Sequence, residues 1–378
     1  MNTHQTHQTR PPSVAPYQSQ GKRRANRARR WMIVVASVVA LGLIAWPVMS
    51  YFHIPPFTDK GDPVSYDQAD GANGGKGGKP ADSKTLMPTG PKADFRNEKT
   101  MGDGTHVSVV SITGPKSGFK GKVWVWAPKE YTDPKFAKSG FPVLIALPGG
   151  PGHDGNYWAF GAFGKDKLSL EDSVTKWYQQ GKSKPFLLAM PILNPGPDDG
   201  GIYWDGSDIP GQPKMGTWLT EDVPDLMKQN FRTLKPRDGW AFMGSSTGGF
   251  VGLKSVLQKP DKFKAVIASG PDIVPDSPLW KGHETQRQEN NPEVLAKRLI
   301  AAKGPDVYLS FQYGTKENAK MISDVKKFIA TYGDKGPIHT KLNVIEGGTH
   351  NAATYLRGMD AGPIQWISEH LEGPTPSS

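Results

Sequence analysis

The fold of this chain is decided by residues 240–253, which read Trp240-Ala241-Phe242-Met243-Gly244-Ser245-Ser246-Thr247-Gly248-Gly249-Phe250-Val251-Gly252-Leu253. A short apolar run enters the motif Gly-x-Ser-x-Gly, and a helix-like stretch that reaches Gln258 leaves it. This order predicts a strand, a sharp turn and a helix, with the hydroxyl of Ser246 presented at the end of a sheet. Glycines suit such a turn because its backbone is strained and larger side chains would collide with the strand and the helix. The alternative is a Gly/Ser-rich turn without chemistry.

The positive charge of the chain is concentrated at its N-terminus. The 378 residues carry a formal net charge of +10, and residues 1–30 contain seven basic side chains and no acid. This leaves a net charge of +3 for the remaining residues. A basic tail is no evidence that the folded part binds nucleic acid, so we expect no nucleic-acid partner. The seven basic residues are Arg10, Lys22, Arg23, Arg24, Arg27, Arg29 and Arg30.

An uncharged segment of 22 residues, 31–52, follows the basic tail. At about 1.5 Å per residue, a helix of this length spans about 33 Å, which is enough to cross a bilayer core. Trp31 stands at one end and Tyr51 and Phe52 at the other, as expected at membrane interfaces. We predict one transmembrane anchor in the cell membrane, with the tail 1–30 in the cytoplasm and the rest outside. A cleaved signal peptide is the alternative, but the apolar run exceeds the usual length of about 7–15 residues and no Ala-x-Ala-like site follows.

Residues 53–105 separate this segment from the rest of the chain. They are rich in Gly, Pro, Lys, Asp and Ser, with the glycine-rich run 71–78 at their centre. Because they lack apolar periodicity, we predict a flexible linker here. The chain contains no cysteine, so it uses no disulfide and no cysteine metal ligand.

Short apolar runs alternate with helix-like stretches over residues 106–373. The first two runs predict antiparallel strands, whereas several later runs are continuous, as expected of strands buried on both faces. This alternation predicts one α/β domain, with a mostly parallel central sheet and helices on both faces. The predicted strands lie at 107–112, 122–126, 142–147, 186–191, 240–243, 265–268, 307–312 and 342–345, and the predicted helices at 170–180, 219–230, 292–302, 317–332 and 364–371.

A serine hydroxyl is a weak nucleophile unless a general base takes its proton and an acid orients that base. In folds with this turn, the order along the chain is serine, acid, histidine. Four histidines follow Ser246, and His350 lies just beyond the strand 342–345, at the strand end where such a base is displayed. A loop histidine without a catalytic role is the alternative. The other three histidines lie too close to the serine turn, enter a strand or sit in a terminal helix, and they are His283, His339 and His370.

Three carboxylates are candidates for the acid that orients His350. Glu317 follows the strand 307–312 and lies at a C-terminal strand edge, so we prefer it. Asp272 follows the strand after the serine turn, and Asp324 lies a helical turn or two beyond Glu317, where it would face solvent. The residues alone leave Asp272 and Asp324 as alternatives.

The charge that develops on an attacked carbonyl oxygen requires two backbone N–H groups aimed at it. Thr247, directly after the serine, should supply one. The loop Pro148-Gly149-Gly150-Pro151-Gly152 should supply the other. Because proline has no N–H to donate, Gly149 or Gly150 must be the donor, and we prefer Gly150. Residues 150–155 also match the dinucleotide motif Gly-x-Gly-x-x-Gly. Pro151 lacks the N–H that a pyrophosphate needs, and the acids that follow fall in a helix-like stretch, so we expect no nucleotide cofactor.

Several segments resemble the esterase D-like family of α/β-hydrolases and, within it, the mycolyltransferase antigens of mycobacteria. The resemblance covers about residues 106–372 and implies an α/β-hydrolase fold in which Ser246, Glu317 and His350 form a catalytic triad. The segments are 125–131 (Val-Trp-Ala-Pro-Lys-Glu-Tyr), 217–224 (Thr-Trp-Leu-Thr-Glu-Asp-Val-Pro), 259–263 (Lys-Pro-Asp-Lys-Phe), Gly314-Thr315-x-Glu317 and Gly348-Thr349-His350.

The chain differs from the mycolyltransferases beside the expected site. Those enzymes carry an Asp just before the first glycine of the oxyanion loop and an Arg two residues after it, where this chain has Pro148 and Pro151. In the mycolyltransferases the histidine is followed by Ser-Trp, whereas in this chain His350 is followed by Asn351 and Ala352. We therefore expect a serine esterase that hydrolyses small-molecule or lipid acyl esters, without metal or organic cofactor. An acyltransferase of the mycolyltransferase type and a non-catalytic surface binding protein on the same scaffold are the alternatives.

Overall fold

The computed structural model describes residues 61–66, 80–150, 154–196 and 203–377. The predicted tail 1–30 and the predicted transmembrane segment 31–52 lie outside these ranges. Among the helices within them, none is both long and apolar enough to cross a membrane. The strands in the described ranges are β1 (Thr85–Leu86), β2 (Arg96–Thr100), β3 (His106–Thr113), β4 (Lys120–Trp126), β5 (Val143–Leu147), β6 (Leu187–Pro191), β7 (Thr233–Leu234), β8 (Trp240–Ser245), β9 (Ala265–Ser269), β10 (Val307–Gly314) and β11 (Ile338–Ile345).

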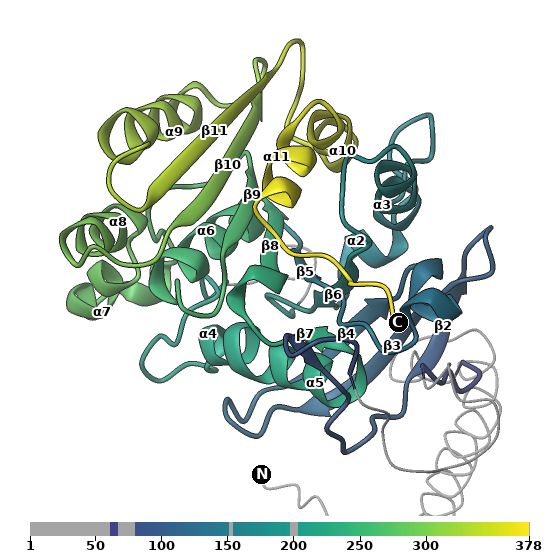
Figure 1. Cartoon of the computed structure of the whole chain (residues 1–378). Coiled ribbons are helices and arrows are strands. Elements are labelled where there is room, and N and C mark those ends of the chain that lie inside the picture. Colours follow the sequence, from purple (N-terminus) through teal and green to yellow (C-terminus); the bar gives the residue numbers. More distant parts are fainter. Residues whose placement is uncertain (1–60, 67–79, 151–153, 197–202, 378) are drawn as a thin grey trace, which may run out of the picture. The chain divides into compact units, whose positions relative to one another are not determined.

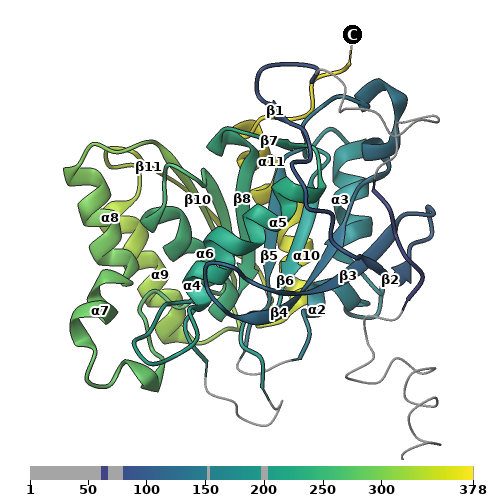
Figure 2. The same cartoon turned by 90° about the horizontal axis from the view of Figure 1, so that it is seen from below.

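Nine of these strands form one sheet in the order β11-β10-β9-β8-β5-β6-β4-β3-β2, and β1 pairs with β7 in a separate two-stranded sheet. The strands from β11 to β6 pair in parallel with their neighbours. The pairs β6–β4, β4–β3 and β3–β2 are antiparallel. Figure 2 shows the sheet with β11 on one side and β2 on the other. The prediction of a mostly parallel sheet that begins with an antiparallel pair is confirmed.

Helices cover both faces of the sheet (Figure 1). One layer contains α6, α8 and α9, and the opposite layer contains α3, α10 and α11. The α-helices are α2 (Tyr157–Phe160), α3 (Leu170–Gln179), α4 (Met215–Thr217), α5 (Val223–Asn230), α6 (Thr247–Gln258), α7 (Glu284–Glu289), α8 (Pro292–Ala301), α9 (Ala319–Tyr332), α10 (Ala352–Asp360) and α11 (Pro363–Glu369). The shorter 3-10 and π turns are η1 (Lys129–Thr132), η2 (Pro134–Phe136), η3 (Trp218–Asp222), η4 (Arg237–Gly239) and η5 (Pro278–Trp280).

The central strands form the core of the fold. Every residue of β5, β6, β8 and β9 is buried. Strands covered by helices on both faces need apolar side chains on both faces, so they appear in the sequence as continuous apolar runs. This two-sided burial is why the sequence predicted these four strands within one or two residues.

The parallel pairing brings the carboxyl ends of four strands to one edge of the sheet. Leu147, the last residue of β5, is paired with Gly244 near the end of β8. The ends of β10 and β11 are likewise paired, Gly314 with Ile345. The segments that follow these strands therefore share one edge, and among them are the serine turn and the loops that carry the preferred acid and base. Ligands of open α/β sheets bind at this edge.

The prediction of a flexible linker over 53–105 is wrong for the parts of it that the structure describes, residues 61–66 and 80–105. β2 pairs with β3 as the edge strand of the large sheet, and the side chain of Phe95 just before it is only 3% exposed. The ring of Tyr66 packs against Phe95 and Phe231, with ring centroids 5.6 and 4.7 Å apart. The backbone N–H of Val64 also donates to Phe95 O at 2.9 Å. The folded domain therefore begins well before residue 106.

Near the predicted site, one predicted helix differs from the structure and one helix of the structure was not predicted. The helix expected at 317–332 begins at Ala319, because Asn318 accepts hydrogen bonds from the N–H groups of Lys320 and Met321 and so caps it. Glu317 therefore lies in the loop before the helix. A further helix, α10, starts directly after the His350 loop and was not predicted from the sequence.

Candidate active site

The turn between β8 and α6 holds Ser246 in a strained backbone conformation. Its φ and ψ are 54° and −125°, which favours glycine over any residue with a side chain. Its N–H donates to Ser269 O at 2.8 Å, which fixes the turn against β9. A Cβ atom on Gly244 would collide with the backbone of Gly248, and one on Gly248 would collide with Leu147 O. Both glycines of the motif are therefore required by close backbone packing around the serine.

Glu317 and His350 are hydrogen bonded to each other. Glu317 Oε2 lies 2.6 Å from His350 Nδ1, and the Glu317 side chain has no exposed surface, whereas that of His350 is 46% exposed. The other carboxylate oxygen of Glu317 accepts the N–H of Gly314 at 2.5 Å. The two loops are also joined through their backbones, since Lys316 N donates to Gly348 O at 2.9 Å. The acid is thus rigidly held, and the imidazole reaches the surface of the site.

Tyr355 is a third member of this cluster, and it was not predicted from the sequence. Its hydroxyl lies 2.8 Å from Glu317 Oε2 and 2.7 Å from His350 Nδ1. Burial, followed by the negative charge of Glu317, raises the pKa of Tyr355, so the phenol stays protonated and can donate to the carboxylate. Asn351 caps α10 by accepting the N–H of Thr354, and apolar residues follow at helical spacing. This cap was the available sequence signal for the helix that carries Tyr355.

The hydrogen bonds around Glu317 keep it ionised. Burial alone would raise its pKa, but the hydrogen bonds from His350, from the N–H of Gly314 and from Tyr355 outweigh burial, and the pKa of Glu317 is lowered. An ionised carboxylate at Nδ1 stabilises the imidazolium that forms when His350 takes up a proton.

The backbone of Gly270 packs against the Glu317–His350 pair. Its φ is +52°, and its N–H donates to Gln312 O at 2.7 Å. A Cβ atom at this position would collide with the hydroxyl of Tyr355 and would lie 2.6 Å from Glu317 Oε2 and 3.0 Å from His350 Cε1. Only glycine allows the backbone to approach the cluster this closely.

The two alternative acids have other surroundings. Asp272 lines a cavity together with Ser246 and His350, but within the described part of the chain it makes no hydrogen bond to His350. Burial, followed by the charge of Asp276, raises the pKa of Asp272. Asp324 forms an ion pair with Lys320 at 2.6 Å on α9. Of the three carboxylates, Glu317 is the one that bonds to His350.

The other histidines after Ser246 lie away from this cluster. His283 precedes α7. His339 lies in β11, 3.2 Å from Asp306. His370 stacks on the ring of Tyr308 with centroids 3.7 Å apart. Among the described residues, no group of three or more His, Asp and Glu side chains could hold a metal ion.

The loop after β5 approaches the serine turn through Gly149 and Gly150. The N–H of Gly149 donates to the hydroxyl of Tyr157 at 2.6 Å. Gly150 has a φ of +83° and lines a cavity that Ser246 also lines. Thr247 is the first residue of α6, and an N–H at such a position has no acceptor within its own helix. Residues 151–153 of this loop lie outside the described ranges.

Two cavities meet at Ser246 and His350. One, of about 390 Å³, extends along the loop after β5 and is lined by aromatic side chains, including Tyr157, Phe163 and Tyr355. The other, of about 490 Å³, extends toward α9. Its walls combine apolar and charged side chains, and they include Ile273, Val274, Met321, Asp272, Asp276 and Lys320. The serine and the histidine are thus accessible from two sides.

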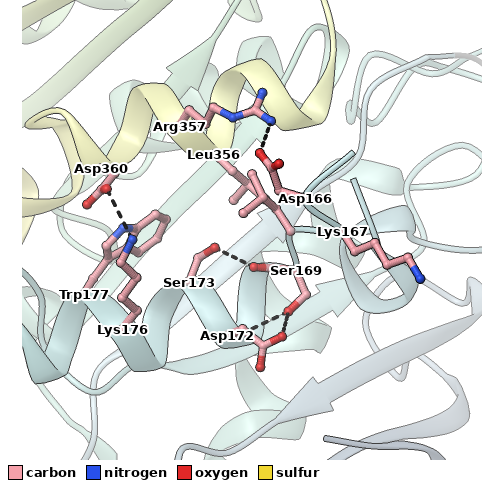
Figure 3. Close-up of a pocket in the computed structure, with 11 residues that line it drawn as sticks. Asp166, Lys167, Ser169, Asp172, Ser173, Lys176, Trp177, Leu356, Arg357 and Asp360 are labelled. Atoms are coloured by element: carbon pink, nitrogen blue, oxygen red, sulfur yellow. Dashed lines mark hydrogen bonds and ion pairs between the residues drawn. The ribbon is translucent and has the colours of Figure 1, made fainter. Parts of the chain in front are cut away.

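A third cavity, of about 230 Å³, lies between α3 and α10 (Figure 3). Several of its polar side chains are bonded to one another: Arg357 pairs with Asp166 at 2.6 Å, and the hydroxyl of Ser169 donates to Asp172 at 2.7 Å. None of Ser246, Glu317 and His350 lines it. We therefore place the candidate active site at the other two cavities.

Comparisons with known proteins identify the family and the fold. The sequence matches the family described as "Putative esterase" over residues 118–355. An uncharacterized protein of Corynebacterium glutamicum is 23% identical over 304 residues, which cover 76% of this chain and 65% of that protein. The alignment thus includes less than two thirds of the curated relative.

Several solved structures share the fold. A ferulic acid esterase superposes with a TM-score of 0.55 at 16% identity, covering 71% of this chain and 99% of that one. A fluorophosphonate-binding serine hydrolase of Staphylococcus aureus gives 0.55 at 15% identity, covering 70% and 98%. An S-formylglutathione hydrolase from Agrobacterium tumefaciens gives 0.52 at 17% identity, covering 72% and 98%.

The family match runs over 118–355 and so includes every strand from β4 to β11, together with the serine turn. A mostly parallel sheet with a strained serine between a central strand and a buried helix is the α/β-hydrolase arrangement. This chain belongs to the esterase family that the family match describes and has the α/β-hydrolase fold.

Proposed function

We propose that the protein is a membrane-anchored, extracytoplasmic serine esterase that uses Ser246, Glu317 and His350 as its catalytic triad. The observation that carries this proposal is the 2.6 Å hydrogen bond from His350 Nδ1 to the buried Glu317, at a cavity that His350 shares with Ser246. A carboxylate bound to one nitrogen of an imidazole fixes the ring and leaves the other nitrogen free to take a proton.

The proposed reaction proceeds through an acyl-enzyme. Ser246 Oγ adds to the carbonyl carbon of the ester while its proton passes to His350 Nε2. The carbonyl oxygen becomes an oxyanion, for which the backbone N–H groups of Thr247 and Gly150 are the proposed donors. The bond from carbon to the alcohol oxygen then breaks, and the alcohol leaves with the proton from His350. Water attacks the acyl group on Ser246 by the same route, and the free acid is released.

Activity-based labelling combined with ester hydrolysis tests the proposal. We expect a fluorophosphonate probe to label the wild type and the protein to hydrolyse p-nitrophenyl esters. Ser246→Ala should abolish both, whereas the neighbouring Ser245→Ala should still be labelled. Labelling that survives Ser246→Ala, or that depends on Ser245 instead, would overturn the assignment. Absence of labelling and turnover in the wild type would favour the non-catalytic binding protein.

The location is supported by the sequence of residues 1–52, with its basic tail and uncharged segment. We expect the full chain to fractionate with membranes and its C-terminal domain to be digested by protease added outside the cell. Recovery of a mature form that begins near residue 50 would instead show that the apolar segment is a cleaved signal.

Acyl transfer is the second candidate function. It is favoured by the two cavities on either side of Ser246 and His350, since an alcohol acceptor in one of them could replace water while the acyl group occupies the other. The substitution of Pro148 and Pro151 for the charged residues of the mycolyltransferases favours hydrolysis.

A further inference from the structure

The hydroxyl of Tyr157 joins the loop after β5 to the serine turn. It accepts the N–H of Gly149 at 2.6 Å and is also hydrogen bonded to the hydroxyl of Ser245, the residue before the proposed nucleophile. Gly149 lies so close to the turn that a Cβ atom on it would be 2.7 Å from Ser245 O and 2.9 Å from Ser246 Cβ. One phenol thus bonds both segments that the proposed oxyanion hole requires.

The hydrogen bond from Gly149 to Tyr157 determines which N–H groups of the loop remain available to a ligand. Between Pro148 and Gly152, the two prolines have no N–H, so only Gly149, Gly150 and Gly152 can donate. Tyr157 accepts the N–H of Gly149. Of the two described glycines in this loop, Gly150 is the one whose N–H is left for a ligand.

Tyr157 is itself firmly held. Its ring packs against Trp158 and Phe163, with centroids 5.1 and 6.0 Å apart, and Trp158 Nε1 donates to Leu147 O at 2.9 Å at the end of β5. Burial raises the pKa of Tyr157, so the phenol stays neutral at ordinary pH and keeps both a proton to donate and lone pairs to accept. A rigid, neutral hydroxyl is suited to fixing a loop.

We propose that Tyr157 is a positioning residue of the oxyanion hole, which holds Gly149 against the serine turn and so directs the N–H of Gly150 toward the developing oxyanion. The proposal rests on the serine-esterase function proposed above. Tyr157 acts through the loop, without a bond to the substrate. Because the oxyanion forms only in the transition state, loss of the hydroxyl should lower kcat while KM stays nearly constant.

The test compares Tyr157→Phe with the wild type, using Tyr178→Phe as the matched control. Tyr178 lies in α3, outside the residues that line the two cavities. Removal of one oxyanion donor costs about 10²–10³-fold in kcat, so loss of the residue that positions a donor should cost about 10-fold or more. KM should change by less than about twofold. Tyr178→Phe should leave both unchanged.

A trifluoromethyl ketone supplies a readout that a general structural defect would not reproduce. Its carbonyl carbon bonds to Ser246 Oγ, the serine proton passes to His350, and the carbonyl oxygen becomes an oxyanion. We expect Tyr157→Phe to weaken binding of the ketone by the same factor as kcat, with an unchanged melting temperature. Equal kcat and equal ketone affinity in Tyr157→Phe and the wild type would overturn the proposal.

Failure of the esterase function and failure of the variant to fold can each be told apart from failure of this proposal. Wild-type protein that neither cleaves esters nor binds the ketone would refute the esterase function itself. If Tyr157→Phe does not fold, Ser245→Ala carries the test, because it removes the bond from Tyr157 to the serine turn and keeps the bond from Gly149 to Tyr157. We then expect kcat and ketone affinity to fall by the same factor while KM stays nearly constant, and wild-type values of both would overturn the proposal.

Discussion

The hydroxyl of Tyr355 lies 2.8 Å from Glu317 Oε2, the same oxygen to which His350 Nδ1 is bonded at 2.6 Å. The carboxylate therefore receives hydrogen bonds from two side chains on one oxygen and from the N–H of Gly314 on the other. Such a buried and fully bonded carboxylate has one orientation and one charge state. This environment distinguishes Glu317 from the other carboxylates near Ser246.

The first prediction identifies the acid by substitution. Glu317→Gln should lower kcat on the order of 10³–10⁴-fold, because a neutral amide cannot stabilise the imidazolium of His350. Asp272→Asn, which changes a carboxylate of the neighbouring cavity in the same way, should stay close to the wild type. Steady-state hydrolysis of a p-nitrophenyl ester measures both. If Asp272→Asn loses most of its kcat while Glu317→Gln stays close to the wild type, Asp272 is the acid.

The second prediction concerns the close approach of Gly270 to the cluster. Gly270→Ala should lower kcat by about 10-fold or more and the free energy of unfolding by about 1–3 kcal/mol, because the new Cβ collides with Tyr355 and the backbone at φ +52° is strained. Gly282→Ala is the matched control. Gly282 also has a positive φ, +83°, but apart from its two chain neighbours no described residue has an atom within 4 Å of the position that a Cβ would take there.

The control separates backbone strain from the collision. Gly282→Ala should cost about 1 kcal/mol of stability and leave kcat unchanged. Urea unfolding and ester hydrolysis measure the two quantities. A Gly270→Ala variant with full activity would show that the cluster can shift to admit a methyl group without losing its geometry.

The third prediction concerns Glu171, in the first turn of α3. Its side chain is fully buried, and neither carboxylate oxygen has a hydrogen-bond partner of good geometry among the described residues. Burial raises the pKa of Glu171 to about 7 from an ordinary value of 4.5. Below pH 4.5 the carboxyl is protonated in both the folded and the unfolded chain, so its full contribution to stability is present there.

Between pH 4.5 and about 7 only the unfolded chain releases this proton, so stability falls as the pH rises. Above pH 7 the decrease in the free energy of unfolding approaches about 3 kcal/mol. Glu171→Gln removes this dependence, so the stability of the variant relative to the wild type should increase steadily from about pH 5 to about pH 8. Calorimetric melting across this range tests the slope. A constant difference between the two proteins would show that Glu171 is not protonated in the fold.

The serine turn, the strand ends and the Glu317–His350 pair could be predicted because each depends on local sequence. Gly244 and Gly248 are required within a few residues of Ser246, and a continuous apolar run identifies each buried strand. Tyr157 and Tyr355 could not be predicted in the same way. Their hydroxyls acquire a role through contacts with residues distant in the sequence, and a tyrosine at the end of an apolar stretch is ordinarily a core residue.

The linker was mispredicted for a different physical reason. β2 reads Arg-Asn-Glu-Lys-Thr, with residues that are half-buried or exposed, because it is the edge strand of the sheet. An edge strand pairs through its backbone on one side and can carry polar side chains on both faces. The apolar signal was limited to Phe95 and Met101 on either side of it, both of which are buried.

The fourth prediction follows from this edge strand. A fragment that begins at residue 59 should be soluble and as active as the full chain, because it keeps Tyr66, Phe95 and β2. A fragment that begins at residue 100 loses the buried side chain of Phe95, worth about 1.5–3 kcal/mol, together with the partly buried Tyr66, and it exposes the edge of β3. We expect it to melt at a clearly lower temperature or to aggregate. Equal melting temperatures of the two fragments would show that the segment before residue 100 adds no stability.

The last prediction concerns the acceptor of the acyl group. Pro148 and Pro151 stand where the mycolyltransferases carry a charged pair that helps hold the sugar, and a sugar hydroxyl buried without partners loses much of its binding energy. Water should therefore compete well, and simple hydrolysis should dominate over transfer to trehalose. The measurement is to incubate the enzyme with an acyl donor, with and without trehalose, and to compare free acid with acyl-trehalose.

We expect free acid to account for most of the product. Its rate of formation should be the same with and without trehalose, because water attacks the acyl-Ser246 intermediate in both incubations. Ser246→Ala is the control, since it should form neither product above the uncatalysed rate. Predominant acyl-trehalose would contradict the prediction and would mean that other residues of the two cavities replace the charged pair. A comparison with glycerol as acceptor would then separate recognition of the sugar from a general preference for alcohols over water.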